Sequence, residues 1–415
     1  MLTMFLCFAL STQAAVPIPP AQFFQEARQA WAVEAGKSWG QSLAGPMLLV
    51  DPVTRQVWAS EMDGEHQLVD QAGLFTGTLP KSIGIANTAI VWAGKRWSMV
   101  LLPLPESSLA RRSLIIHESW HRIQPSLGLD VQDLSNGHLD KLEGRYWLQL
   151  EWRALAKALE APKEPSSTWI AAALACRTRR QALFPKAIEA ERNLELAEGL
   201  AEYTAIRATG TKGLVVEKLL KASGPFARSF AYVSGPAYGL LLDEVTPDWP
   251  RRVRRATDLS ILLQEAYHLP ASTPAEAEAA AAKLGGAELR TLEVAEDQGR
   301  QLRLSLATDP LTKGPTLRVP GPFNVQFNPN NTESLDGGAA YHPTATYLGT
   351  WGRLEVTGGS LRSADWSEAR VTAPVKPEAQ PWSGQGWTLE LNPGWTMVPT
   401  EPSGSFQLVL EKKDK

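Results

Sequence analysis

The sequence predicts an α+β protein in which a small, mostly antiparallel sheet, a block of helices and an all-β domain follow one another. Three observations predict this order. Short apolar runs separated by turn residues fill 15–105, a 3.6-residue apolar period fills 106–297, and β-prone runs among Gly, Pro and Asn fill 298–415. A chain of 415 residues can bury two or three cores, so we interpret the first two stretches as one domain and the last as another.

The first residues are typical of a secretory signal peptide. Leu2–Leu10 is an apolar run too short to span a bilayer, and small residues at Thr12 and Ala14 favour cleavage after Ala14. We therefore expect residues 1–14 to be removed and the protein to be exported, to the periplasm or beyond the cell. No later segment approaches about 18 uninterrupted apolar residues, so stable membrane insertion is not expected.

Local patterns place the individual elements. In the first stretch, turn pairs such as Asp63-Gly64 separate four expected strands: Pro46–Val50, Gln56–Ser60, Thr88–Trp92 and Trp97–Leu104. Helices are predicted over Leu139–Ala161, Ser167–Leu183, Pro185–Thr209 and Pro274–Leu284. Strands of a sandwich or barrel-like domain are predicted over Gln301–Leu306, Asn324–Phe327, Arg353–Val356, Gly386–Leu391 and Ser405–Glu411.

Composition narrows the class of protein. A formal net charge of −3 and scattered basic residues argue against a nucleic-acid partner. Of the two cysteines, Cys7 lies in the signal and Cys176 in a predicted helix, so neither a disulfide framework nor a cysteine metal site is expected. Function must therefore be sought in other side chains.

The segment His117-Glu118-Ser119-Trp120-His121 contains the pattern HExxH. Residues four apart lie on one face of a helix, so both imidazoles can bind a single Zn²⁺ while the Glu118 carboxylate is directed toward a metal-bound water. Apolar residues precede the motif and a predicted sheet lies before it, as suits a half-buried active-site helix. The alternative is a helix that presents two histidines to solvent.

Two histidines leave a catalytic zinc one protein ligand short. Six residues after His121 stands Leu127, where a third histidine would be needed for a metzincin. A predicted helix instead carries an acidic stripe, formed by Glu191, Glu195, Glu198 and Glu202. In this stripe Glu198 is the first choice for the third ligand and Glu195 the second. Glu202, one turn after Glu198, could accept the other ring N–H of a ligand histidine. Small residues including Gly199 would let this helix approach the HExxH helix, although the stripe could also be a solvated face.

HESWH followed by EGLAEY resembles the gluzincin group of zinc metallopeptidases, to which thermolysin-like enzymes belong. The resemblance covers Trp97–Leu242. It implies a zincin-like catalytic domain holding one Zn²⁺ through His117, His121 and Glu198, with Glu118 as general base and Glu202 supporting a histidine. Two features depart from the group. The 76 residues between His121 and Glu198 require an inserted helical pair, and the GxMEN-type signature of gluzincin aminopeptidases is absent.

Related enzymes use a later Tyr or His to stabilise the oxyanion, and Tyr232 and Tyr238 are the candidates for that role, with packing as the alternative for each. His138 is expected to be a turn and N-cap residue, with a site residue as the alternative. The sequence as a whole predicts an exported zinc metallopeptidase that acts on peptides or proteins. A non-catalytic binding or structural protein on the same scaffold, and a zinc hydrolase of non-peptide amides, are the alternatives.

Overall fold

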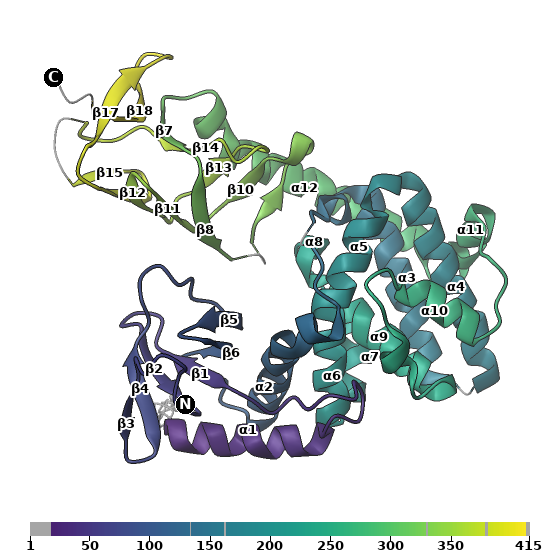
Figure 1. Cartoon of the computed structure of the whole chain (residues 1–415). Helices are drawn as coiled ribbons and strands as arrows, with labels where there is room; N and C mark the ends of the chain where they lie inside the picture. Colours follow the sequence, from purple (N-terminus) through teal and green to yellow (C-terminus); the bar gives the residue numbers. More distant parts are fainter. Residues whose placement is uncertain (1–17, 133, 162, 329–330, 378–380, 412–415) are drawn as a thin grey trace, which may run out of the picture. The chain divides into compact units, whose positions relative to one another are not determined.

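The computed structural model describes residues 18–411 apart from 133, 162, 329–330 and 378–380 (Figure 1). The predicted signal peptide lies outside the described residues. The fold is α+β with mostly antiparallel sheets, which confirms the predicted class. The chain divides into two compact units, residues 1–127 with 204–210 and residues 128–203 with 211–415. No helix of the described residues is both long and apolar enough to cross a membrane.

A six-stranded sheet forms the centre of the first unit, in the order β3-β4-β2-β1-β6-β5. Its strands are β1 (Met47–Val50), β2 (Gln56–Ala59), β3 (Val69–Gln71), β4 (Leu74–Thr78), β5 (Thr88–Trp92) and β6 (Lys95–Leu101). Strand β1 pairs with β6 in parallel, and the other pairs are antiparallel. Alternate side chains such as Leu48, Val50 and Met99 build a core on one face of the sheet.

Two helices lie wholly in the first unit, α1 (Pro20–Glu34) and α2 (Ser108–Ile123). Ser107 caps α2, its hydroxyl accepting from the Ala110 amide at 3.4 Å. Helix α2 packs on α1 and on strands β5 and β6. The HExxH motif therefore lies on a helix supported by a sheet, as the sequence predicts.

The second unit begins with a helical block. Its helices are α3 (Leu142–Glu160), α4 (Lys163–Leu183), α5 (Ile188–Leu194), the start of α6 (Leu200–Thr209), α7 (Lys212–Lys221), α8 (Phe226–Ser229), α9 (Ala231–Val245), α10 (Leu259–Ala266), α11 (Pro274–Lys283) and α12 (Gly286–Thr312). The rest of α6, from Thr204, belongs to the first unit. Short 3-10 turns occur at Gly137–Asp140, Pro185–Ala187 and Trp249–Arg252, and Glu195–Gly199 is a π-helical turn between α5 and α6. Helices α3 and α4 form the closest pair, and α9 packs on α3 and on the π turn.

One predicted strand is wrong. Gln301–Leu306 lies inside α12, which continues to Thr312, so the predicted boundary at residues 297 and 298 also falls within this helix. The alternation of Leu302, Leu304 and Leu306 is typical of a strand with one buried face. In the structure Leu302 and Leu306 are instead exposed on the helix, at 63% and 68%. The alternation therefore reflects no buried face.

The C-terminal part of the second unit is all-β. A seven-stranded sheet has the order β17-β18-β7-β14-β13-β10-β9, and a five-stranded sheet has the order β15-β16-β12-β11-β8. The strands are β7 (Thr316–Pro320), β8 (Phe323–Phe327), β9 (Glu333–Ser334), β10 (Ala340–His342), β11 (Ala345–Gly349), β12 (Gly352–Val356), β13 (Ser360–Arg362), β14 (Glu368–Thr372), β15 (Trp382–Gly384), β16 (Trp387–Leu391), β17 (Trp395–Thr400) and β18 (Ser405–Leu410).

Both sheets contribute to one apolar core, which makes this part a β-sandwich. Three tryptophans, Trp351, Trp382 and Trp387, belong to that core and each donates its indole N–H to a backbone carbonyl. Trp366 is different, since 46% of it is exposed. Most of the tryptophan excess in this part of the sequence thus serves packing.

Candidate metal centre

Helix α2 is held firmly by its neighbours. Ile115, Ile116 and Trp120 are fully buried, and the indole of Trp31 on α1 donates to the Ser119 hydroxyl at 2.8 Å. Arg122, the charged residue after the second histidine, donates to the carbonyls of residues 43 and 44 at 3.0 and 2.9 Å. These contacts fix the rotation of α2 and with it the direction of its histidines.

His117 and His121 lie one turn apart, and their Nε2 atoms are 3.1 Å from each other. Nδ1 of His121 pairs with Oε1 of Gln124 at 3.2 Å. A carboxamide oxygen only accepts, so this contact puts a proton on Nδ1 and makes Nε2, which faces Nε2 of His117, the acceptor atom of a neutral His121 ring. Two ring nitrogens this close must share a proton or a cation, because two bare lone pairs would repel each other. Glu118, the predicted general base, is 4% exposed on the same helix.

Glu198 stands on the π-helical turn Glu195–Gly199, and both of its oxygens are engaged. The Tyr232 hydroxyl donates to Oε2 at 2.6 Å, and the Arg228 guanidinium donates to Oε1 at 3.2 Å. Arg228 and Tyr232 are four residues apart along α8 and α9, whose junction at Phe230 keeps helical torsions, so they share one face. An ionised carboxylate has about four acceptor sites, so it can accept more than these two hydrogen bonds.

The π turn is seated closely on α9. A Cβ on Gly235 would lie 2.3 Å from the Cα of Gly199, so only glycines allow this approach. Gly199 therefore packs closely against α9. The sequence predicts instead that the small residues of this stretch pack against the HExxH helix. A π turn widens the helix locally and is frequent at functional sites. Here it lies at the residue predicted as the third ligand.

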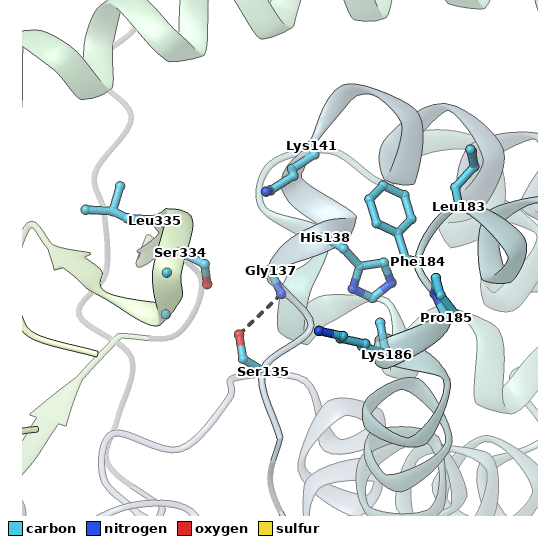
Figure 2. Close-up of a pocket in the computed structure, with 13 residues that line it drawn as sticks. Ser135, Gly137, His138, Lys141, Leu183, Phe184, Pro185, Lys186, Ser334 and Leu335 are labelled. Carbon is cyan, nitrogen blue, oxygen red and sulfur yellow. Dashed lines mark hydrogen bonds between the residues drawn. The ribbon is translucent and has the colours of Figure 1, made fainter. Parts of the chain in front are cut away.

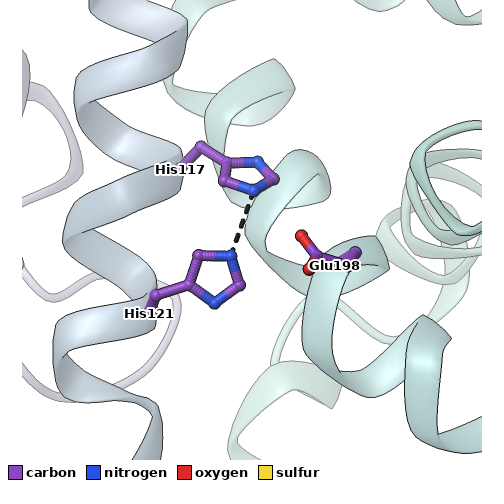
Figure 3. Close-up of side chains that lie close together, drawn as sticks. All are labelled: His117, His121 and Glu198. Carbon is purple, nitrogen blue, oxygen red and sulfur yellow. Dashed lines mark hydrogen bonds between the residues drawn. The ribbon is translucent and has the colours of Figure 1, made fainter. Parts of the chain in front are cut away.

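The three predicted ligands come together, as Figure 3 shows for the two rings and the Glu198 carboxylate. One ligand atom from each of His117, His121 and Glu198 lies within 4.8 Å of the other two. Two imidazoles and one carboxylate form a donor set that suits a catalytic zinc, and neutral Nε2 is the form of histidine that binds metals. The group could thus hold a metal ion, and Zn²⁺ fits its chemistry.

Glu195, the second choice for the third ligand, faces elsewhere. It is fully buried and accepts two hydrogen bonds from Arg177, at 2.8 and 2.7 Å. Arg180 is equally buried and pairs with Glu191 and Glu151. In this network Arg180 holds the pKa of Glu191 well below its usual range, against the opposing effect of burial. The acidic stripe is therefore not a solvated face, because Glu191 and Glu195 form buried ion pairs. For the same reason its four glutamates do not all serve as candidate metal ligands.

The two tyrosine candidates also separate. Tyr232 contacts Glu198, as described above, whereas Tyr238 is fully buried and donates to Oε1 of Glu151 at 2.9 Å. Burial and the neighbouring Glu151 raise the pKa of Tyr238 well above its usual value. The hydroxyl of Tyr238 lies within the buried ion-pair network, which favours the packing alternative, and its catalytic role stays a prediction.

Glu202 accepts from Lys218 at 2.7 Å, and its predicted contact with a ring N–H stays a prediction. His138 is not a helix N-cap. It lies within the 3-10 turn Gly137–Asp140 and its Nε2 is 2.6 Å from Oε1 of Glu191. His138 also lines a pocket of about 740 Å³, in which Figure 2 shows the side chains of Lys141 and Lys186 on the helical side and Ser334 on the other.

Sequence reasoning missed Gln124 and Arg228. The signal for Arg228 was present, since it precedes Tyr232 by four residues on a helical stretch and any residue that Tyr232 contacts is within its reach. Gln124 gave no comparable signal, because it follows the motif at the end of the helix. Comparison of the chain with protein-family models, curated proteins and solved structures found no match to any of them.

Proposed function

We propose that the protein is a zinc-dependent metallopeptidase. The observation that carries the proposal is the group formed by His117, His121 and Glu198, whose ligand atoms lie within 4.8 Å of one another. The glutamate is separated from the second histidine by 76 residues in the sequence. If the HExxH pattern were a chance match on a helix that presents its histidines to solvent, a carboxylate so distant in the sequence would not be expected beside them. The proximity of Glu198 to both histidines therefore favours a metal site.

Zinc bound to these residues would supply Lewis-acid polarisation of a carbonyl and a water of lowered pKa. The chain's own residues carry the proton chemistry. Glu118 is buried beside His117, where its carboxylate takes a proton from the attacking water and passes it to the leaving amine. Gln124 orients the ring of His121, while Tyr232 and Arg228 hold the Glu198 carboxylate. The role of Tyr232 as an oxyanion donor stays a prediction.

The zincin-like fold and export are parts of the same proposal. A mostly antiparallel sheet followed by an HExxH helix that packs on it supports the zincin-like assignment. The resemblance of the motifs to gluzincins supports peptides or proteins as substrates. Cleavage after Ala14 remains an expectation from the sequence, and amino-terminal sequencing of protein recovered from the periplasm or the medium tests it.

The experiment that tests the function is a cleavage profile of a peptide library by purified protein, with and without a chelator. We expect cleavage by the protein as purified, loss of cleavage after chelation and recovery on addition of about one equivalent of Zn²⁺. Metal-independent cleavage, or no cleavage of any peptide by zinc-loaded protein, would overturn the proposal. In the second case, hydrolysis of a non-peptide amide by the same sample would identify the alternative zinc hydrolase.

A further inference from the structure

A second, smaller pocket of about 180 Å³ lies within the second unit, beside the residues that hold Glu198. Its helical side includes Asn136 and Arg228, and its β-sandwich side includes Phe327, His342, Arg362 and Trp366. Arg228 connects the pocket to the candidate metal centre, since the same guanidinium donates to Glu198 at 3.2 Å. A group bound in this pocket would thus lie one residue away from a metal ligand.

His342 presents an acceptor without a donor. It is 2% exposed on β10, and its Nδ1 is 3.0 Å from the Thr332 hydroxyl. That hydroxyl has a single proton, and donating it to the Asn328 carbonyl at 3.1 Å selects the tautomer in which His342 Nδ1 carries a proton and donates to the hydroxyl. The Nε2 atom therefore carries a lone pair, and it has no hydrogen-bond partner among the described residues. Burial and the nearby Arg362 lower the pKa of His342 to about 4, which keeps the ring neutral.

Asn136 presents a second acceptor of the same kind. It is 2% exposed, and its Nδ2 donates to the Ala190 carbonyl at 3.2 Å, which fixes the orientation of the amide. Its Oδ1 is buried and has no hydrogen-bond partner among the described residues. Buried polar atoms of proteins are normally satisfied, and each one left unmatched costs about 1–3 kcal/mol. Two unmatched acceptors around one pocket indicate that its occupant brings a hydrogen-bond donor.

The charges around the pocket restrict that donor. Arg228 and Arg362 disfavour an ammonium group by like-charge repulsion. A carboxylate has no proton to donate to His342 or Asn136. A neutral hydroxyl satisfies both conditions, because it donates to a lone pair and accepts from a guanidinium.

The walls and the size restrict the rest of the occupant. The Phe327 ring centroid is 4.6 Å from that of His342, and the Arg362 guanidinium lies 4.1 Å from the Trp366 ring centroid. Trp366 adopts left-handed torsions with φ of 61°, which is uncommon for so large a residue. A cavity of about 150 Å³ holds one benzene molecule, so this pocket of about 180 Å³ has room for one six-membered ring with a small substituent.

We propose that this pocket receives the phenol side chain of a tyrosine in the peptide substrate, its ring between Phe327 and Trp366 and its hydroxyl donating to His342 Nε2 or Asn136 Oδ1. The proposal rests on the peptidase function for its substrate, but the binding of a phenol does not require metal or cleavage. It makes this pocket the one that selects the side chain near the scissile bond.

The test is binding of N-acetyl-tyrosinamide and N-acetyl-phenylalaninamide, measured by calorimetry on chelator-treated protein and on zinc-loaded protein. The tyrosine compound is expected to bind at least about tenfold more tightly, because the phenylalanine compound leaves the buried acceptors unmatched. Removal of both acceptors, by His342→Phe together with Asn136→Leu, should abolish this difference. Because these changes are buried, Trp366→Ala at the exposed wall serves as a second variant and should weaken the tyrosine compound about tenfold.

Trp169→Ala is the matched control, since Trp169 also lies under a cation, with Lys157 Nζ 4.9 Å from its ring centroid, but does not line the pocket. Binding should be unchanged in this variant. Equal binding of the two amides, or no binding of either, would overturn the proposal. If zinc-loaded wild-type protein hydrolyses no peptide but still binds the tyrosine compound more tightly than the phenylalanine compound, only the proposed peptidase function is overturned.

Discussion

The hydroxyl of Tyr232 donates a 2.6 Å hydrogen bond to Oε2 of Glu198, the carboxylate that groups with His117 and His121. This contact does two things. It orients the candidate third ligand, and it uses a hydroxyl that the sequence predicts to serve the oxyanion. Side chains that orient ligands typically contribute about 10–100-fold to metal affinity.

Replacing Tyr232 by phenylalanine keeps the ring and removes the donor. We expect Tyr232→Phe to weaken zinc binding about tenfold, measured by competition with a chromogenic chelator. Tyr238→Phe is the matched control. It removes a buried donor from Glu151, so it should lower the free energy of unfolding by about 1–3 kcal/mol and leave zinc affinity unchanged. Equal losses of zinc affinity in the two variants would contradict the assignment.

A second pair of variants separates the two glutamates of the π turn. Glu198→Gln should lower zinc affinity by at least about a hundredfold with little effect on folding, because it removes the anionic ligand. Glu195→Gln should do the reverse, since it removes the nearest of the four carboxylates around the buried Arg177, at a cost of about 1–3 kcal/mol in unfolding free energy. Zinc titration and urea unfolding of both variants test this, and loss of zinc by Glu195→Gln alone would reverse the assignment.

The stability of the protein should also report the neutral state of His342. Burial lowers the pKa of this residue from 6.5 to about 4, so the unfolded chain takes up a proton more readily than the folded one. Its contribution is present above about pH 6.5 and is lost as the pH falls toward 4. By this linkage about 2 kcal/mol of unfolding free energy disappears between pH 7.5 and pH 5.

His342→Phe cannot take up that proton, so urea unfolding at the two pH values should show a correspondingly smaller pH dependence in this variant. Glu191, whose pKa is depressed, contributes in the same direction but at lower pH, below its ordinary value of 4.5. The difference between the wild-type protein and the variant therefore isolates His342. An identical pH dependence in both would show that His342 does not titrate as stated.

The HExxH site could be predicted from the sequence because its geometry is local. His117 and His121 are four residues apart on one helix, so the helix geometry alone places them on the same face, whatever packs around it. Glu198 was only partly predictable, because the acidic stripe also contains Glu191 and Glu195. In a regular helix Glu195 and Glu198 share one face. The π turn rotates them apart, so that Glu195 meets Arg177 and Glu198 meets Tyr232.

The errors have physical causes of the same kind. The pattern at 301–306 alternates as a strand would, but long-range packing decides whether such leucines are buried, and here α12 leaves two of them in solvent. Gly199 and Gly235, which allow the π turn to pack closely on α9, are far apart in the sequence. No short-range sequence pattern predicts that they are in contact. The β-sandwich pocket likewise combines residues from distant strands, such as His342 and Trp366.

The central claim is that His117, His121 and Glu198 hold a zinc ion and that Glu118 moves the proton. The most direct measurement is the metal content of the wild-type protein and of Glu118→Gln, together with hydrolysis of a peptide that the wild type cleaves. We predict about one zinc per chain in both proteins and a loss of hydrolysis in the variant of about 10²–10⁴-fold, since the ligands remain and the general base is gone. A wild-type protein without zinc, or a variant that hydrolyses the peptide as fast as the wild type, would contradict the claim.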